Sequence, residues 1–89
     1  MRKNTNIIEK RFKDGTIVFN GEKIFLFKGI SQILWDFVES IPQEEMIKII
    51  SETFGISEEL VRKDVEDFFE KLLKENLVIK ENIWFSLKI

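Results

Sequence analysis

The stretch TIVFNGEKIFLF, residues 16–27, decides how the first part of this chain folds. Asn20 and Gly21 divide it, and an Asn-Gly pair between apolar runs is the strongest short signal of a β-hairpin, because a two-residue turn needs positive φ. Residues 23–27 then read Lys-Ile-Phe-Leu-Phe. Successive side chains of a strand point to opposite faces, so four consecutive apolar residues leave this strand without a polar face. The sequence predicts a hairpin whose second strand needs an apolar cover on both sides.

A second turn signal, Asp14-Gly15, separates a strand predicted over residues 6–12 from one over residues 16–20. Consecutive strands joined by tight turns pair with their neighbours, so the three strands form an antiparallel meander. The strand at 23–27 then lies at an edge of the sheet. An exposed edge presents unpaired backbone N–H and C=O groups, which another chain can use.

The apolar spacing becomes helical after the third strand. Apolar residues recur three and four positions apart over residues 30–40, which predicts an amphipathic helix. The single proline fits the first turn of a second helix over residues 42–54. Ser57 fits the N-cap of a third helix, predicted over residues 57–76.

The third helix carries more apolar surface than one packing contact needs. At about 100° per residue its apolar side chains cover an arc of about 140°, wider than the stripe of about 100° that faces a single core. These side chains are Val61, Val65, Phe68, Phe69, Leu72 and Leu73. The first two helices can cover only part of this arc, so the rest faces something else.

Residues 77–88 predict a hairpin or a single returning strand. We therefore expect one α+β domain over residues 1–89, without internal repeats or linkers. Three helices followed by a terminal strand or hairpin are the order of a small winged helix-turn-helix, here preceded by the three-stranded antiparallel meander.

Composition opposes catalysis. The 89 residues include no cysteine, histidine or tyrosine, which removes thiol chemistry, the side chain that titrates near pH 7 and the commonest metal ligand. Phosphate-binding, dinucleotide-binding and nucleophile-elbow motifs are also missing from the sequence. We expect no enzyme activity, no catalytic residue, no cofactor and no metal. No run reaches the ~20 apolar residues of a membrane span and no signal-peptide core is evident, so we expect a cytoplasmic protein without a membrane partner.

Two carboxylate pairs on the third helix have a spacing that could share a cation. Asp64 and Asp67 are three residues apart, and Glu66 and Glu70 are four apart. A polar helix face produces such pairs routinely, and no histidine accompanies them. We interpret them as a solvated helix face.

A winged helix-turn-helix invites a nucleic-acid interpretation, which the charges oppose. The helix that would read DNA, residues 57–76, has seven acidic residues against four basic ones. Phosphate contacts dominate DNA affinity, so a helix with this net negative charge is repelled by the duplex. Residues 1–28 carry seven basic against three acidic residues, which we interpret as solvation of a strand face. We expect no nucleic-acid partner and keep a DNA-binding transcriptional regulator as the alternative function.

Nine phenylalanines and two tryptophans exceed what a small core obviously needs. Phe25 and Phe27 lie on the predicted edge strand, and Phe69 lies on the over-wide side of the third helix. If that helix packs beside the edge strand, a hydrophobic groove opens between them. An extended peptide can bind such a groove by adding a strand to the edge. Four other aromatic residues are most simply core: Trp35, Phe37, Phe54 and Phe68.

Several features between residues 20 and 79 occur together in one known family. In order they are the apolar third strand and Gly29, Ile33-Leu34-Trp35, Pro42 to Met46, Asp64-Val65 with Phe68, Leu72 and Leu73, and Asn76 to Val78. In this order and spacing the chain resembles the PqqD-like family, also called the RiPP recognition element. The resemblance implies a small winged helix that binds the leader segment of a ribosomally synthesised precursor peptide. It also implies delivery of that leader to a modifying enzyme, often a radical-SAM protein.

Carried over by position, the resemblance implies a peptide-binding site on the third strand and the third helix. The site residues are Lys23, Ile24, Phe25, Leu26 and Phe27 on the strand, and Arg62, Val65, Glu66 and Phe69 on the helix. Residues 80–89 extend beyond the usual end of the family, and Trp84 and Phe85 are candidates to cover the groove or contact the enzyme. The leading hypothesis is a non-catalytic peptide chaperone, and a homodimer that pairs two edge strands is a further alternative.

Overall fold

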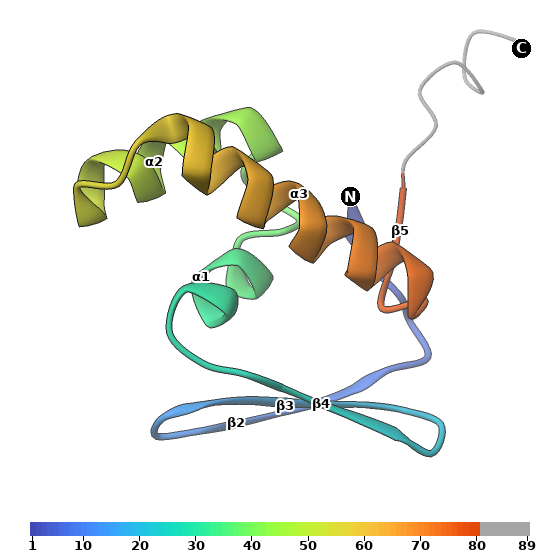
Figure 1. The fold of residues 1–89 in the computed structure, drawn as a ribbon. Coiled ribbons are helices and arrows are strands. Elements are labelled where there is room, and N and C mark those ends of the chain that lie inside the picture. Colours follow the sequence, from blue (N-terminus) through green and yellow to red (C-terminus); the bar gives the residue numbers. More distant parts are fainter. Residues whose placement is uncertain (81–89) are drawn as a thin grey trace, which may run out of the picture.

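The computed structural model describes residues 1–80. Three helices lie on one side of a small antiparallel sheet (Figure 1). The elements are β1 (Arg2–Lys3), β2 (Ile8–Phe12), β3 (Gly15–Asn20), β4 (Lys23–Phe27), α1 (Ile30–Asp36), α2 (Gln43–Phe54), α3 (Glu58–Lys74) and β5 (Val78–Ile79). The predicted α+β order of meander, three helices and C-terminal strand is confirmed. No helix in the described part of the chain is long and apolar enough to cross a membrane.

The two predicted hairpins form a sheet with the strand order β2-β3-β4. Asn20 pairs with Lys23, which leaves Gly21 and Glu22 as the turn. Gly21 has a φ of 63°, whereas Glu22 does not have positive φ. A glycine with positive φ at the first central position is the signature of a type II′ turn, whose twist matches that of the flanking strands. The Asn-Gly signal therefore places the turn through the glycine, while Asn20 remains in β3.

The two faces of the sheet have different surroundings. On the face toward the helices, Val18 is fully buried and Phe27 is 7% exposed. On the opposite face Ile24 is 65% exposed and Leu26 is 52% exposed, and the register places Ile8 of β2 on the same face. Figure 1 shows the helices on one side of the sheet only. Within residues 1–80 the helices thus cover only one face of β4, although the sequence predicts an apolar cover on both faces. The other face is an exposed apolar surface.

α1 is shorter than the helix predicted over residues 30–40. It ends at Asp36, and Phe37 follows as the C-cap with a φ of −106°. Phe37 is 44% exposed, and Phe54 at the end of α2 is 46% exposed. The prediction that these two phenylalanines belong to the core is wrong, because both stand at helix ends where the apolar stripe no longer faces a neighbouring element. Trp35 is fully buried, and its indole Nε1 donates a hydrogen bond to Glu9 Oε1 at 2.6 Å.

The C-terminal end of α2 and the N-terminal end of α3 have capping residues, and Ser57 takes the N-cap position that the sequence predicts. Gly55 ends α2 in the left-handed conformation, with a φ of 66°. Ser57 is the N-cap of α3, and its Oγ accepts a hydrogen bond from the Leu60 N–H at 3.4 Å. Acidic residues occupy the first turn of both helices, where they complement the helix dipole. These local signals fix the C-terminal end of α2 and the N-terminal end of α3.

The two ends of the described chain pair with each other. β1 and β5 form a separate two-stranded antiparallel sheet, with Arg2 opposite Ile79 and Lys3 opposite Val78. Asn4 secures this sheet, because its Nδ2 donates to the Asn76 carbonyl at 2.8 Å. The C-terminal segment is therefore a returning strand through Ile79. The rest of the predicted hairpin over 77–88, with Trp84 and Phe85, lies outside the described residues.

The buried and exposed aromatic residues of the first helical segment give a test of the core. We expect Trp35→Ala to lower the free energy of unfolding by about 3–5 kcal/mol, because it leaves a cavity in the core. Phe37→Ala removes an exposed ring and should lower it by less than about 1 kcal/mol. Urea titrations followed by circular dichroism measure both variants. Equal losses in the two would contradict this assignment of the core.

Candidate functional site

β4 has an open edge. Among residues 1–80 it pairs with β3 only. Antiparallel ladders alternate between hydrogen-bonded and non-hydrogen-bonded pairs, and a two-residue turn makes its flanking residues a hydrogen-bonded pair. Starting from the pair of Asn20 and Lys23, the backbone groups of Phe25 and Phe27 bond to β3. Those of Ile24 and Leu26 therefore point outward, where they can bond to another chain.

A hollow of about 230 Å³ lies beside this edge. Its lining comes from β4, from α1, from the C-terminal half of α3 and from the segment after α3. The lining residues are Phe25, Leu26, Phe27, Ser31, Phe68, Lys71, Leu72 and Leu77. Most of them are apolar, so the hollow can bury apolar side chains of a ligand that lies along the strand. We call this hollow the β4 groove.

Aromatic packing fixes the floor of the β4 groove. The ring of Phe27 lies 5.2 Å from the ring of Trp35 and 5.4 Å from that of Phe68, between centroids. The contact with Phe68 is edge-to-face, an arrangement that aromatic quadrupoles favour. Phe68 also packs edge-to-face against Phe69 at 5.9 Å. The groove is therefore formed before any ligand enters it.

Polar contacts hold the other end of β4 to the end of α3. Lys23 Nζ lies 3.0 Å from Glu75 Oε2, and Asn20 Nδ2 donates to the Glu75 carbonyl at 3.0 Å. Together with the contact between Phe27 and Phe68, they set α3 antiparallel to β4. One end of the groove is thus apolar, and the other is bounded by an ion pair.

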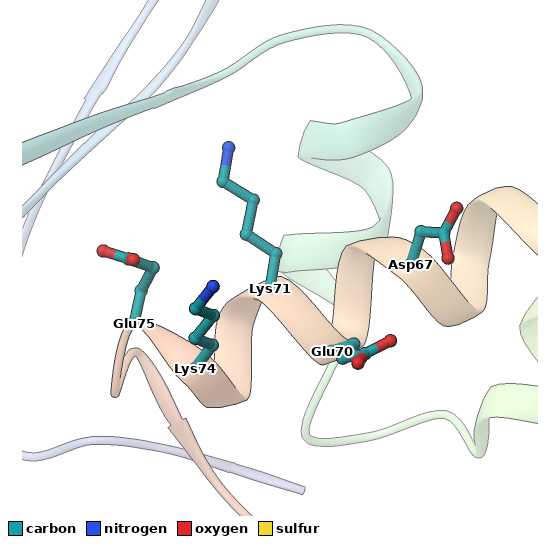
Figure 2. A pocket seen from close by; sticks show the side chains of 5 residues that line it. All are labelled: Asp67, Glu70, Lys71, Lys74 and Glu75. Atoms are coloured by element: carbon teal, nitrogen blue, oxygen red, sulfur yellow. The ribbon is translucent and has the colours of Figure 1, made fainter.

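A second hollow, of about 370 Å³, lies on α3 next to the β4 groove (Figure 2). Five charged side chains line it: Asp67, Glu70, Lys71, Lys74 and Glu75. It is larger than the groove, but the side chains of a single helical segment surround it and it opens widely to solvent. We therefore regard the apolar groove as the binding site and the charged hollow as its border. Lys71 belongs to both.

The structure brings the strand residues of the predicted site together. Phe25, Leu26 and Phe27 line the β4 groove, and Lys23 stands at its end. Ile24 contributes an outward backbone while its side chain lies on the exposed face of the sheet.

The helix residues of the predicted site do not line this groove. Val65 and Phe69 are 2% and 3% exposed and belong to the core. Arg62 donates a hydrogen bond to Glu44 of α2, which lowers the pKa of that carboxyl and raises the pKa of the guanidinium. Glu66 is exposed on α3. The placement of Phe69 at the groove is corrected to Phe68, because neighbouring helix positions differ by about 100° in direction.

Sequence reasoning missed three groove residues on α3. Phe68, Lys71 and Leu72 stand at helical spacings of three and four, so they share one face of the helix. That spacing is visible in the sequence. It became meaningful only once the structure showed which face of α3 lies toward β4.

The groove offers a binding surface of backbone groups and mostly apolar side chains. Within residues 1–80 no cluster of three histidine, cysteine or acidic side chains could hold a metal ion. Every buried side-chain polar atom of the described part has a hydrogen-bond partner. What the site presents is a row of backbone groups beside an apolar floor.

The fold and the site together define a class of protein. Its members are winged helices with a leading meander, an open sheet edge and an adjoining apolar groove. The sequence profile described as "Coenzyme PQQ synthesis protein D (PqqD)" matches residues 15–78. This chain belongs to the PqqD family, which confirms the resemblance seen in the sequence. No curated protein matches the sequence.

A solved structure titled "TbiB1 in Complex with the TbiA(beta) Leader Peptide" has a similar fold. The TM-score is 0.81, and the similarity covers 92% of this chain and 99% of that one. The two sequences are 16% identical, so the comparison establishes the shared fold and no more.

Amide hydrogen exchange can test the open edge. We expect the N–H groups of Ile24 and Leu26 to exchange at least tenfold faster than those of Phe25 and Phe27, because only the latter bond to β3. Two-dimensional NMR after transfer to D₂O measures all four. Equal protection at dilute concentration would show that the edge is already covered, by residues beyond 80 or by a second copy.

Proposed function

We propose that this chain is a non-catalytic peptide chaperone that binds the leader segment of a ribosomally synthesised precursor peptide. The leader adds a strand to β4 and is presented to a modifying enzyme, for which a radical-SAM protein is the leading candidate. The observation that carries this proposal is the open edge of β4 beside a preformed apolar groove. Membership of the PqqD family supports it, as does a similar fold whose title names a bound leader peptide.

The energetics suit a peptide that is held and later released. Four new backbone hydrogen bonds contribute roughly 0.5–1.5 kcal/mol each, and two buried apolar side chains about 1.5–3 kcal/mol each. The sum is about 5–12 kcal/mol. Ordering a flexible peptide and restricting its translation offset much of this gain. With about 4 kcal/mol for association and about 2 kcal/mol for ordering the peptide, the upper end of the sum leaves about −6 kcal/mol, a dissociation constant of tens of micromolar.

The outer face of the sheet supports the presentation step. Ile8, Phe12, Ile24 and Leu26 are exposed there by 61, 43, 65 and 52%. Exposed apolar patches of several hundred Å² commonly mark interaction surfaces. An added strand would place its alternate side chains next to Ile24 and Leu26 and enlarge the patch. An enzyme docking there would distinguish the loaded protein from the empty one.

The DNA-binding alternative gains no support from the site. α3 carries acidic side chains along its exposed surface, as Asp67, Glu70 and Glu75 show in Figure 2. These carboxylates oppose contact with phosphates. We place the proposed activity in the cytoplasm, where precursor peptides are synthesised.

Peptide binding can be tested by charging the groove. We expect Phe25→Asp to weaken binding of the cognate leader at least tenfold, because a carboxylate would replace an apolar wall of the groove. Ile49→Asp, at a residue of α2 that is 41% exposed, is the matched control and should change affinity less than twofold. Fluorescence anisotropy with peptides encoded beside this gene gives the dissociation constants, and circular dichroism confirms folding. Unchanged affinity in Phe25→Asp would place the peptide elsewhere.

Strand addition makes a further prediction about the peptide itself. Backbone N-methylation removes one donor and should weaken binding about tenfold at alternate positions, while the positions between them tolerate it. The same anisotropy assay measures a series of singly methylated leaders. Equal effects at consecutive positions, or none, would contradict pairing with β4.

The outer face can be separated from leader binding by changing β2, which lies away from the open edge. We expect Ile8→Ser combined with Phe12→Ser to preserve leader affinity within about twofold. The same change should lower the rate of leader-dependent modification at least tenfold at limiting enzyme. Quantifying modified peptide by mass spectrometry tests this, with Leu60→Ser on α3 as the control for loss of an exposed apolar residue. An unchanged rate would exclude this face as the docking surface.

A further inference from the structure

Lys71 is a cation within the apolar groove. It lies on α3 between the two hollows and lines both of them. Figure 2 shows its side chain rising from the helix toward the sheet, whereas Glu70 points to the other side of the helix. Its ammonium group therefore stands where a peptide alongside β4 would pass.

No carboxylate of the described chain holds this ammonium. Glu75, one turn further along α3, is paired with Lys23 at 3.0 Å. Asp67, one turn earlier, directs its carboxylate away from Lys71 (Figure 2). Within residues 1–80 no acidic oxygen lies within 4.0 Å of Lys71 Nζ, in contrast to Lys23, Arg11 and Arg62. Lys71 is thus available to a charge brought by a ligand.

The antiparallel arrangement of α3 and β4 places Lys71 along the strand. Phe68 contacts Phe27, and Glu75 contacts Lys23. Lys71 lies three of the seven residues from Phe68 toward Glu75, and the same fraction of the four residues from Phe27 toward Lys23 falls between Leu26 and Phe25, nearer Phe25. A peptide strand antiparallel to β4 meets Phe27 first and Phe25 two residues later, with both side chains directed toward the helices.

We propose that Lys71 is a specificity-determining residue that selects a leader with an acidic side chain two residues after an apolar anchor. The anchor fills the space between Phe27 and Phe68, and the carboxylate pairs with the Lys71 ammonium beside Phe25. A charge-assisted hydrogen bond at the edge of an apolar hollow is stronger than one in open solvent. This inference rests on the proposed function and defines the class of peptide that the groove takes.

A second role for Lys71, covering apolar surface with its stem, can be separated from this one. Lysine stems often cover apolar surface while the ammonium stays in water. Under that role the charge is irrelevant and the stem alone matters. Lys71→Met keeps a stem of similar length and removes only the charge, so it distinguishes the two.

The test is a charge scan of the cognate leader. Each position is replaced in turn by Glu and by Lys, and affinities are measured for the wild type, Lys71→Met and Lys71→Glu. We expect one position, two residues after the apolar anchor, at which the wild type prefers Glu over Lys at least tenfold. Lys71→Glu should reverse that preference and Lys71→Met should abolish it. Lys74→Glu, which changes a lysine of the charged hollow only, should retain it.

The outcomes separate this inference from the proposed function. Saturable binding with no position of charge preference, or a preference that survives Lys71→Met, overturns the role of Lys71 and leaves leader binding intact. A preference lost equally in Lys74→Glu shows a general effect of surface charge and also overturns it. If neither the leader nor any scanned peptide binds, the proposed function fails and the role of Lys71 fails with it.

Discussion

The packing of Phe27 between Trp35 and Phe68 is the contact on which the rest of the structure depends. It anchors the last residue of the edge strand to α1 and α3 at once, with centroid separations of 5.2 and 5.4 Å. The ion pair of Lys23 with Glu75 holds the first residue of the same strand. With both ends fixed, β4 lies beside α3 at a set distance and its outer edge stays open. A ligand would therefore meet a formed groove, so in the proposed complex the entropy of ordering falls mainly on the peptide.

Most of the fold was predictable because its signals are local. Turn glycines, the change from a period of two to a helical period and the N-cap serine each act over a few residues, and the structure places β2 to β4 and the three helices accordingly. The pairing of β1 with β5 has no such signal. It joins Arg2-Lys3 to Val78-Ile79 across the whole described chain, and two polar residues do not read as a strand. Only the tertiary arrangement shows that pairing.

Half of the candidate site was predictable for a related reason. Four consecutive apolar residues break the alternation of a half-buried strand, and this anomaly identifies β4 from the sequence alone. On α3 the sequence pattern does not show which residue lines the groove, because Phe68 and Phe69 are adjacent and both apolar. The sequence shows that the apolar arc is too wide, but the direction of β4 relative to the helix decides which ring is core. Lys71 was overlooked for the same reason, since a lysine on a charged helix looks like part of a solvated face.

An open apolar edge is a liability in an isolated chain, because it invites pairing with other edges. β4 is only five residues long, and Lys23 and Lys28 stand at its two ends, which limits the reach of any incoming strand. A further strand on this edge would remove the liability. It would also occupy the outward backbone groups of Ile24 and Leu26, so that a ligand could no longer bond to them. The groups that endanger the free protein are thus the ones that a peptide would use. In the proposed function, a short strand with charged ends beside a groove that Lys71 lines would admit an extended peptide and would limit pairing with a second copy of the chain.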